Sequence, residues 1–292
     1  MCFSAVMSDH ASESRTEELR AIAQRVADAM PPDVLEVVVT GSVSRGVADE
    51  VSDIEMLVVP AEPLELEEAY AIARAAGLKR LGSWGAHGTE VKRVSGYRDG
   101  APLELVFWSR DYAESSVEKI VAGESSSSAE ALANGLALRT SGLLEEWQAR
   151  LRVYPEEMAA ARIEDAALPW GGFAAAGVLT LLRPGDRLAL VEWIYDGAVR
   201  VLRIVYTLNR VWEPTTKRLE ARVATLPLKP DRLAERITEA LSEQDPRKAL
   251  LVMTELQADT VALAPNGPNV DRARIWLAEA AEILQALPQS PV

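Results

Sequence analysis

Three acidic side chains and a glycine-serine pair are the residues of this 292-residue chain whose types and spacing could do chemistry. Asp53 and Glu55 stand at the start of an apolar run, and residues two apart on a strand point to the same face. Two neighbouring carboxylates repel one another unless a cation lies between them. Mg²⁺ is the natural candidate, because it prefers carboxylate oxygens and completes its shell with water and substrate phosphates. We therefore expect Asp53 and Glu55 to bind Mg²⁺.

Gly41 and Ser42 supply the complementary half of such a site. Glycine lets the backbone approach a phosphate closely, and the turn N–H groups, the Ser42 hydroxyl and Arg45 are donors to phosphate oxygens. Glu104 lies between two leucines in an apolar run, so its side chain leaves that strand on the opposite face from theirs. If this strand pairs beside the one carrying Asp53, Glu104 completes a three-carboxylate cluster for one or two divalent ions.

Short β-branched runs and amphipathic helices are the elements that must position these residues. The pattern predicts strands at 35–40, 54–59, 89–94, 103–108 and 136–139. Helices are predicted at 14–30, opened by the capping pair Ser14 and Glu17, at 64–76, and from the capping pair Ser127 and Glu130. Beyond residue 143 the strand signal disappears, and the clearest helix covers 187–212. The predicted class is α+β, with a mixed β-sheet domain and flanking helices at 1–150 and an all-α helical bundle at 151–292.

Composition excludes several functional classes. Residues 1–150 hold 14 basic and 25 acidic residues, against 17 and 19 in 151–292, and this acidity disfavours a nucleic-acid partner. No apolar run approaches the roughly 18 to 20 residues of a membrane helix, and the first residues lack a secretory pattern, so we expect a cytoplasmic protein without membrane association. One cysteine and two histidines leave no Cys/His zinc site, and His87, without a visible partner, is interpreted as incidental.

The order of these motifs resembles the nucleotidyltransferase domain of the DNA polymerase β superfamily. Gly41, Ser42, Asp53, Glu55 and Glu104 match its motif position by position, with a spacer of ten residues between the Gly-Ser pair and Asp-x-Glu. The segments GSVSRG and SDIE resemble the small bacterial branch that includes aminoglycoside and lincosamide nucleotidyltransferases. Many members carry Asp where this chain has Glu55.

The resemblance implies an enzyme that transfers a nucleoside monophosphate from an NTP, with ATP expected, to a hydroxyl of a small acceptor and releases pyrophosphate. Asp53, Glu55 and Glu104 would hold the Mg²⁺, and Glu104 is also the candidate base for the acceptor proton. An acidic protein suits a cationic acceptor such as an aminoglycoside-like antibiotic, which implies a role in antibiotic resistance.

The second half resembles, more loosely, the helical domain that closes over the nucleotide in these enzymes. Tyr154-Pro155 and the segment 208–220 are the matching features, and Lys217 is the expected triphosphate contact, assisted by Asn209 or Arg210. The alternative is that Lys217 belongs to a solvated helix face. The acceptor pocket is expected between the two domains.

Alternatives to a small-molecule enzyme remain open at the level of sequence. One keeps the chemistry and changes the acceptor to a tRNA end or a protein side chain, as in toxin-type nucleotidyltransferases. Another is a non-catalytic nucleotide-binding module. Glu192 and Asp196 are candidate second-domain contributors to the site or plain solvated residues, and most tryptophans are expected in cores, with one or two able to stack on a base or sugar. The sequence carries no signal for the oligomeric state.

Overall fold

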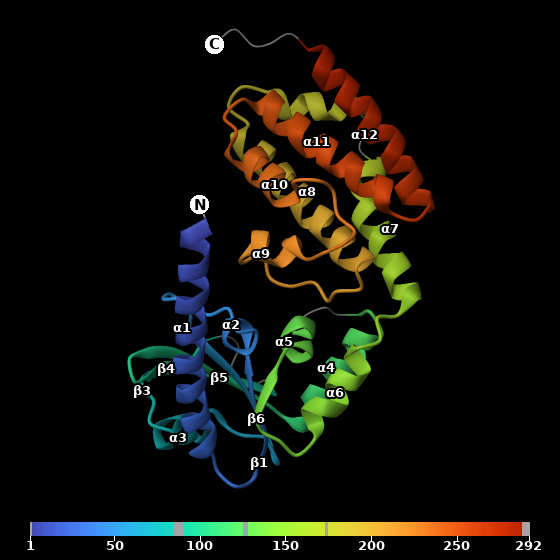
Figure 1. Ribbon diagram of the computed structural model, residues 1–292. Coiled ribbons are helices and arrows are strands. Elements are labelled where there is room, and N and C mark those ends of the chain that lie inside the picture. Colours follow the sequence, from blue (N-terminus) through green and yellow to red (C-terminus); the bar gives the residue numbers. More distant parts are fainter. Residues whose placement is uncertain (1, 85–89, 125–127, 173–174, 288–292) are drawn as a thin grey trace. The chain divides into compact units, whose positions relative to one another are not determined.

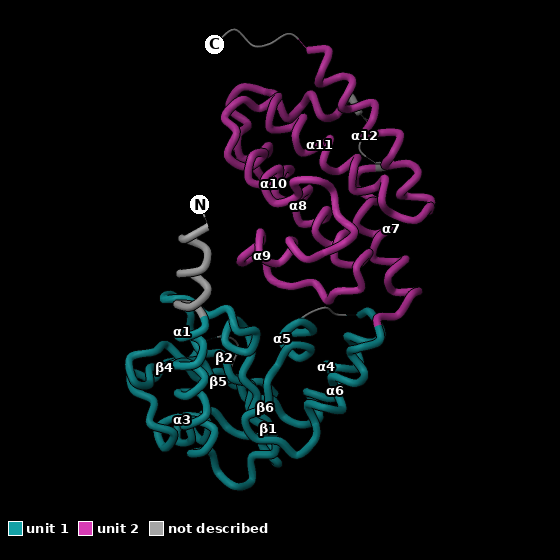
Figure 2. Tube along the Cα trace, in the orientation of Figure 1, with its two compact units in different colours: residues 1–153 teal, residues 154–292 magenta. Residues whose placement is uncertain are grey.

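The computed structural model describes residues 2–84, 90–124, 128–172 and 175–287, and it divides into two compact units (Figure 2). One unit comprises residues 1–153 and the other residues 154–292. The predicted fold class is confirmed, because the first unit contains a mixed six-stranded sheet with helices, and the described part of the second unit contains helices alone. None of the described helices is both long and apolar enough to span a membrane.

The first unit is built on one sheet (Figure 1). Its strands are β1 (Val34–Thr40), β2 (Ile54–Pro60), β3 (Lys79–Gly82), β4 (Val91–Arg98), β5 (Ala101–Trp108) and β6 (Leu136–Arg139). Its helices are α1 (Cys2–Asp28), α2 (Gly41–Ser44), α3 (Leu66–Ala75), α4 (Arg110–Val121), α5 (Ala129–Ala133) and α6 (Leu143–Leu151). The strand order is β3-β4-β5-β2-β1-β6, in which β2 and β5 are parallel and the other neighbours antiparallel.

Period-two alternation along β2 divides its side chains between the two faces of the sheet. Ile54, Met56 and Val58 are at most 1% exposed and pack in one core cluster with apolar residues of α1 and α3. Glu55, between the first two, therefore points to the other face. Helix α4 contacts β2, and helix α6 contacts β1. The fully buried Trp147 of α6 donates from Nε1 to Glu114 of α4.

The second unit is a helical bundle with its own core. Its elements are α7 (Glu156–Gly172), the 3₁₀ helix η1 (Ala175–Leu182), α8 (Arg187–Leu208), α9 (Leu219–Ala224), α10 (Leu233–Ser242), α11 (Pro246–Leu263) and α12 (Pro268–Ala286). The predicted helix at 187–212 is confirmed up to Leu208, and Arg210 takes a left-handed conformation with φ 55°, which ends it. Trp212, the last residue of the predicted helix, therefore lies beyond it.

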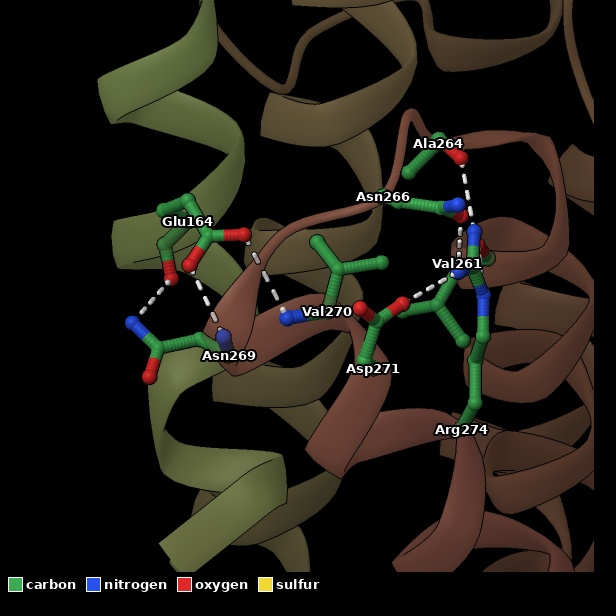
Figure 3. A network of polar contacts seen from close by, with 8 residues as sticks. All are labelled: Glu164, Val261, Ala264, Asn266, Asn269, Val270, Asp271 and Arg274. Atoms are coloured by element: carbon green, nitrogen blue, oxygen red, sulfur yellow. Dashed lines mark hydrogen bonds and ion pairs between the residues drawn. The ribbon is translucent and has the colours of Figure 1, made fainter.

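A polar network ties α7, α11 and α12 together (Figure 3). The Glu164 carboxylate of α7 accepts from the backbone N–H of Asn269 at 2.8 Å and from that of the next residue, near the start of α12. Arg274 donates to the carbonyls of Val261 and Ala264 at the end of α11, at 2.9 and 2.7 Å. Both contacts satisfy backbone groups that a helix end leaves unpaired, and each places a charge where the helix dipole favours it.

Several predicted boundaries differ from the structure. Helix α1 begins at Cys2, so the predicted capping pair at Ser14 is wrong, because this serine lies inside the helix. Strand β3 was missed because Lys79 and Arg80 are exposed on an edge strand and give no apolar signal. The predicted helix start at Ser127, the first residue of the strand predicted at 89–94, and His87 lie outside the described residues.

Candidate functional site

Two glutamates face one another on adjacent parallel strands. Glu55 of β2 pairs in register with Glu104 of β5, and both side chains are partly exposed. The strand pairing on which the prediction for Glu104 depended is thus confirmed. Asp53 immediately precedes β2 and is exposed, and it lines the same hollow as the two glutamates, with a volume of about 410 Å³. The sheet therefore brings the three predicted carboxylates to one region of its surface.

The turn after β1 abuts this region. Thr40, the last residue of β1, pairs in register with Glu55, and the chain then enters α2 at Gly41 with φ +68°. The Glu55 carboxylate lies so close to Gly41 that a β-carbon at that position would overlap its Oε2. Arg20 of α1 fixes the turn by donating to two carbonyls at the end of α2, at 3.0 and 2.8 Å. Glycine at position 41 thus serves both the backbone conformation and the close approach of Glu55.

The two predicted phosphate donors of this turn differ in their surroundings. Ser42 is partly exposed, and its carbonyl accepts from the backbone N–H of Val47 at 3.0 Å, which closes the turn. Arg45 instead forms an ion pair with Glu130 of α5, and both side chains are mostly buried. The pair uses only Nη1 of Arg45, so a phosphate contact would use the remaining N–H donors of its guanidinium or compete with Glu130.

The three carboxylates do not converge on one point. Trp84 donates from its indole Nε1 to Glu104 Oε1 at 2.6 Å, while the Glu55 carboxylate lies against Gly41. Within the part of the chain that the structure describes, no group of three or more His, Cys, Asp or Glu side chains is arranged to hold a metal ion. The donor set itself suits Mg²⁺, because it consists of carboxylate oxygens around one hollow. An ion bound to all three would require the carboxylates to move closer together, and Glu104 Oε2 could serve it while Oε1 stays bonded to Trp84.

Trp84 and Arg93 are site residues that sequence reasoning did not assign. The Arg93 guanidinium lies over the Trp84 ring, 4.8 Å from its centroid. Glu55, Trp84 and Glu104 also line a second hollow of about 260 Å³, whose wall includes the apolar Trp108. These three residues therefore lie where a polar hollow and a more apolar one meet. One signal in the sequence could have found Arg93: it and Ser95 are polar residues two apart on β4. This strand pairs with β5, which carries Glu104.

The residues of the second unit that were predicted to contact the triphosphate differ in their surroundings. Lys217 is exposed in the turn before α9, and its carbonyl accepts from Arg222 Nε at 2.8 Å. The Asn209 amide donates to the carbonyls of Val205 and Leu228 at 2.7 and 2.8 Å and so holds the end of α8. A triphosphate contact by either residue stays a prediction.

Arg210 also serves the structure of its own unit. It forms a two-pronged ion pair with Glu156 of α7 and donates to the Thr207 carbonyl at 2.7 Å. The hydrogen bond lowers the pKa of Glu156 and raises that of Arg210. Of the two acidic residues proposed on α8, Asp196 pairs with Arg200 at 2.6 Å, and Glu192 is exposed.

Comparison with known proteins gives structural neighbours only. No family model matches the chain, and no curated protein matches it. Among solved structures it is similar to a nucleotidyltransferase-like protein from Exiguobacterium sibiricum, at 10% identity over 95% of this chain and 90% of that one, with a TM-score of 0.42. It is also similar to Cid1 in complex with the UTP analog UMPNPP, at 15% identity over 85% of this chain and 66% of that one, with a TM-score of 0.25. Cid1 poly(U) polymerase with bound MgGTP gives 14% identity over 85% and 68%, with a TM-score of 0.26. At these TM-scores the function has to be inferred from the residues of the site.

Proposed function

We propose that this chain is a divalent-ion-dependent nucleotidyltransferase, which moves a nucleoside monophosphate from an NTP to a hydroxyl of a small acceptor. The observation that carries the proposal is the pairing of Glu55 with Glu104 across two parallel strands, with Asp53 lining the same hollow. Directly beside them, Gly41 opens the turn that follows the neighbouring strand. Neighbouring carboxylates repel one another, so their placement side by side favours a bound cation between them.

Asp53, Glu55 and Glu104 are the residues that would hold Mg²⁺, and this ion would supply charge neutralisation on the triphosphate. The chain's own contribution is to position the phosphates. Ser42 is partly exposed and would donate its hydroxyl to a phosphate oxygen, and Gly41, which has no side chain, would let the phosphate approach the turn backbone. Arg45 would add its remaining N–H donors, since its pair with Glu130 uses only Nη1.

The transfer step is a direct displacement at the α-phosphorus. The acceptor hydroxyl oxygen forms a bond to that phosphorus while the bond to the pyrophosphate oxygen breaks, and pyrophosphate leaves with the electron pair. The acceptor proton passes to a carboxylate, for which Glu104 is our choice because it lies between the polar and apolar hollows. Trp84 bonds to Glu104 Oε1, so Oε2 is the oxygen that would accept that proton.

A small cationic acceptor with ATP as donor is the preferred substrate pair. Residues 1–150, which carry the three carboxylates, have 11 more acidic than basic residues, and such a field attracts cations and repels polyanions. Trp84 is 57% exposed beside Glu104 and offers an indole surface to a sugar or base. An aminoglycoside-like antibiotic combines hydroxyls with positive charge and is the acceptor class to test first.

The test is incubation with labelled ATP, GTP, CTP or UTP, Mg²⁺ and a panel of aminoglycosides, lincosamides, tRNA and protein acceptors. We expect label on a small cationic acceptor with wild type and with Glu50→Gln, a control that removes an exposed carboxylate of the same loop. We expect none with the Asp53→Asn/Glu55→Gln double variant. Transfer that survives the double substitution overturns the assignment of these carboxylates. Label on tRNA or protein would keep the chemistry and overturn the acceptor class, and failure of every NTP to bind with Mg²⁺ would overturn the proposal as a whole.

A further inference from the structure

The second unit contains a cavity lined by three tryptophans. Trp170 of α7, Trp193 of α8 and Trp276 of α12 share its wall with Val178 and Leu277, and its volume is about 140 Å³. An apolar cavity of roughly 150 Å³ accepts a molecule of the size of benzene. All of these residues belong to the helical unit, so the cavity is separate from the carboxylates of the sheet.

Two buried polar side chains of α11 have no hydrogen-bond partner among the described residues. Thr254, whose hydroxyl is one of these groups, lines the cavity and is fully buried. Gln257, one turn further along α11, is also fully buried, and neither its amide nitrogen nor its amide oxygen has a partner within the described parts of the chain. Buried polar side chains are almost always satisfied by protein, water or ligand. Of the two, Thr254 lines the cavity, so its hydroxyl is the polar group that an occupant could satisfy if the side chain turned toward it.

The charge on the lining indicates what kind of occupant fits. Asp196 of α8 lines the cavity and is half-exposed, and its Oδ2 accepts from Arg200 Nε at 2.6 Å. The faces of indole rings attract cations, and quaternary or alkyl ammonium groups are well suited to aromatic walls. The same rings and a carboxylate disfavour an anion. A cationic occupant could share Asp196 with Arg200, whereas an anion would face the indole rings and that carboxylate, and the charge of Arg200 is already partly balanced by Asp196.

We propose that this cavity binds a small organic ammonium ion that also carries a hydroxyl or an N–H group. The alkyl ammonium would contact the indoles of Trp170, Trp193 and Trp276, the Asp196 carboxylate would balance its charge, and Thr254 Oγ1 would accept its hydrogen bond. The inference rests on residues of the second unit alone and does not depend on nucleotidyl transfer.

The experiment compares choline with its neutral carbon analogue 3,3-dimethylbutan-1-ol by ¹H–¹⁵N spectra of the full chain. The seven tryptophans give seven indole signals, which single Trp→Phe substitutions assign. We expect choline to shift the signals of Trp170, Trp193 and Trp276, to leave those of Trp84 and Trp108 unmoved, and to bind at least ten times more tightly than the neutral analogue. Equal affinity for both compounds, absence of shifts at millimolar choline, or shifts confined to Trp84 would each overturn the proposal.

Matched variants separate the roles of the wall residues. Asp196→Asn should remove most of the preference for the cation, while Glu192→Gln, an exposed carboxylate on the same helix, should leave it unchanged. Thr254→Val keeps the shape of the side chain and should weaken choline binding several-fold, with little effect on tetramethylammonium, which has no hydroxyl. Identical behaviour of Asp196→Asn and Glu192→Gln would contradict the charge assignment. The Asp53→Asn/Glu55→Gln variant should bind choline normally, so failure of this site and failure of the proposed transferase are distinguishable.

Discussion

Side chains of β2 lie in opposite environments on the two faces of the sheet in the first unit. On the face toward α1 and α3, Ile54 and Met56 of β2 are almost completely buried in a continuous apolar cluster. On the other face the residue between them, Glu55, is partly exposed and stands opposite Glu104. A slip of the strand by one residue would bury the carboxylates and expose the core, so packing on the first face fixes the position of the acidic residues on the second.

The largest expected effect comes from removing charge on the acidic face. Asp53→Asn/Glu55→Gln should lower the rate of nucleotidyl transfer by about 1000-fold or more, which corresponds to about 4 kcal/mol of activation free energy. The unfolding midpoint should change little or rise, because both side chains reach solvent and their mutual repulsion is removed. Label transfer and thermal unfolding of the same preparations measure the two quantities. Loss of rate that only follows loss of folded protein would contradict the division between the faces.

The second largest effect is expected from a substitution on the apolar face of β2. Met56→Ala should lower the free energy of unfolding by about 2–5 kcal/mol, because it opens a cavity in a core position that is 1% exposed. Val51→Ala, three residues before β2 and 91% exposed, is the control and should stay within about 0.5 kcal/mol. Denaturant titration measures both. The KM for NTP of folded Met56→Ala should match wild type, and a selective rise in KM would show that the two faces are not independent.

A smaller effect concerns the bond between Trp84 and Glu104. Trp84→Phe keeps an aromatic ring under Arg93 but removes the indole N–H that occupies Glu104. The Mg²⁺ concentration for half-maximal transfer should fall about three-fold or more, since Glu104 then has both carboxylate oxygens available to the ion. Tyr97→Phe, which alters another aromatic residue of the polar hollow, serves as the control. A higher Mg²⁺ requirement in Trp84→Phe alone would contradict this expectation, because it would mean that Trp84 orients Glu104 for binding the ion.

The smallest effect is expected on stability, from the ion pair between Arg25 of α1 and Asp99. The Arg25 guanidinium of α1 donates to Asp99 at 2.6 Å and lowers the pKa of that carboxyl below its usual value of 3.8. Because the folded pKa is depressed, the pair contributes stability above the unfolded pKa, and this contribution is lost as the pH falls through the folded pKa. The difference in Tm between wild type and Arg25→Gln should therefore be small at neutral pH and vanish in acid. A difference that grows in acid would contradict this assignment.

Local pattern was sufficient to predict the strands that carry the site. Alternation around Glu55 and Glu104 places both on the polar face, and a glycine followed by serine after a β-branched run predicts the turn at Gly41. These features depend on period and on backbone conformation, which short sequence segments encode. The pairing of β2 beside β5 then brings the acidic residues together.

Partners chosen over long sequence separations could not be predicted in the same way. Trp84 bonds to a residue twenty positions away, and Arg45 pairs with Glu130 across eighty-five positions. Which of several donors reaches a given carboxylate depends on side-chain rotamers after the chain has folded. For the same reason the sequence did not show that Asn209 and Arg210, which have the chemistry of phosphate ligands, donate to backbone carbonyls of their own unit.

The divalent-ion site on the acidic face is tested most directly by Mn²⁺ binding in the presence of a non-hydrolysable ATP analogue, followed through the electron paramagnetic resonance signal of free Mn²⁺. We predict that wild type and Glu50→Gln bind the ion with nucleotide, that Glu104→Gln weakens its binding at least ten-fold, and that Asp53→Asn/Glu55→Gln abolishes it. Equal Mn²⁺ binding by wild type and the double variant, or none by wild type with nucleotide present, would contradict the assignment of Asp53, Glu55 and Glu104.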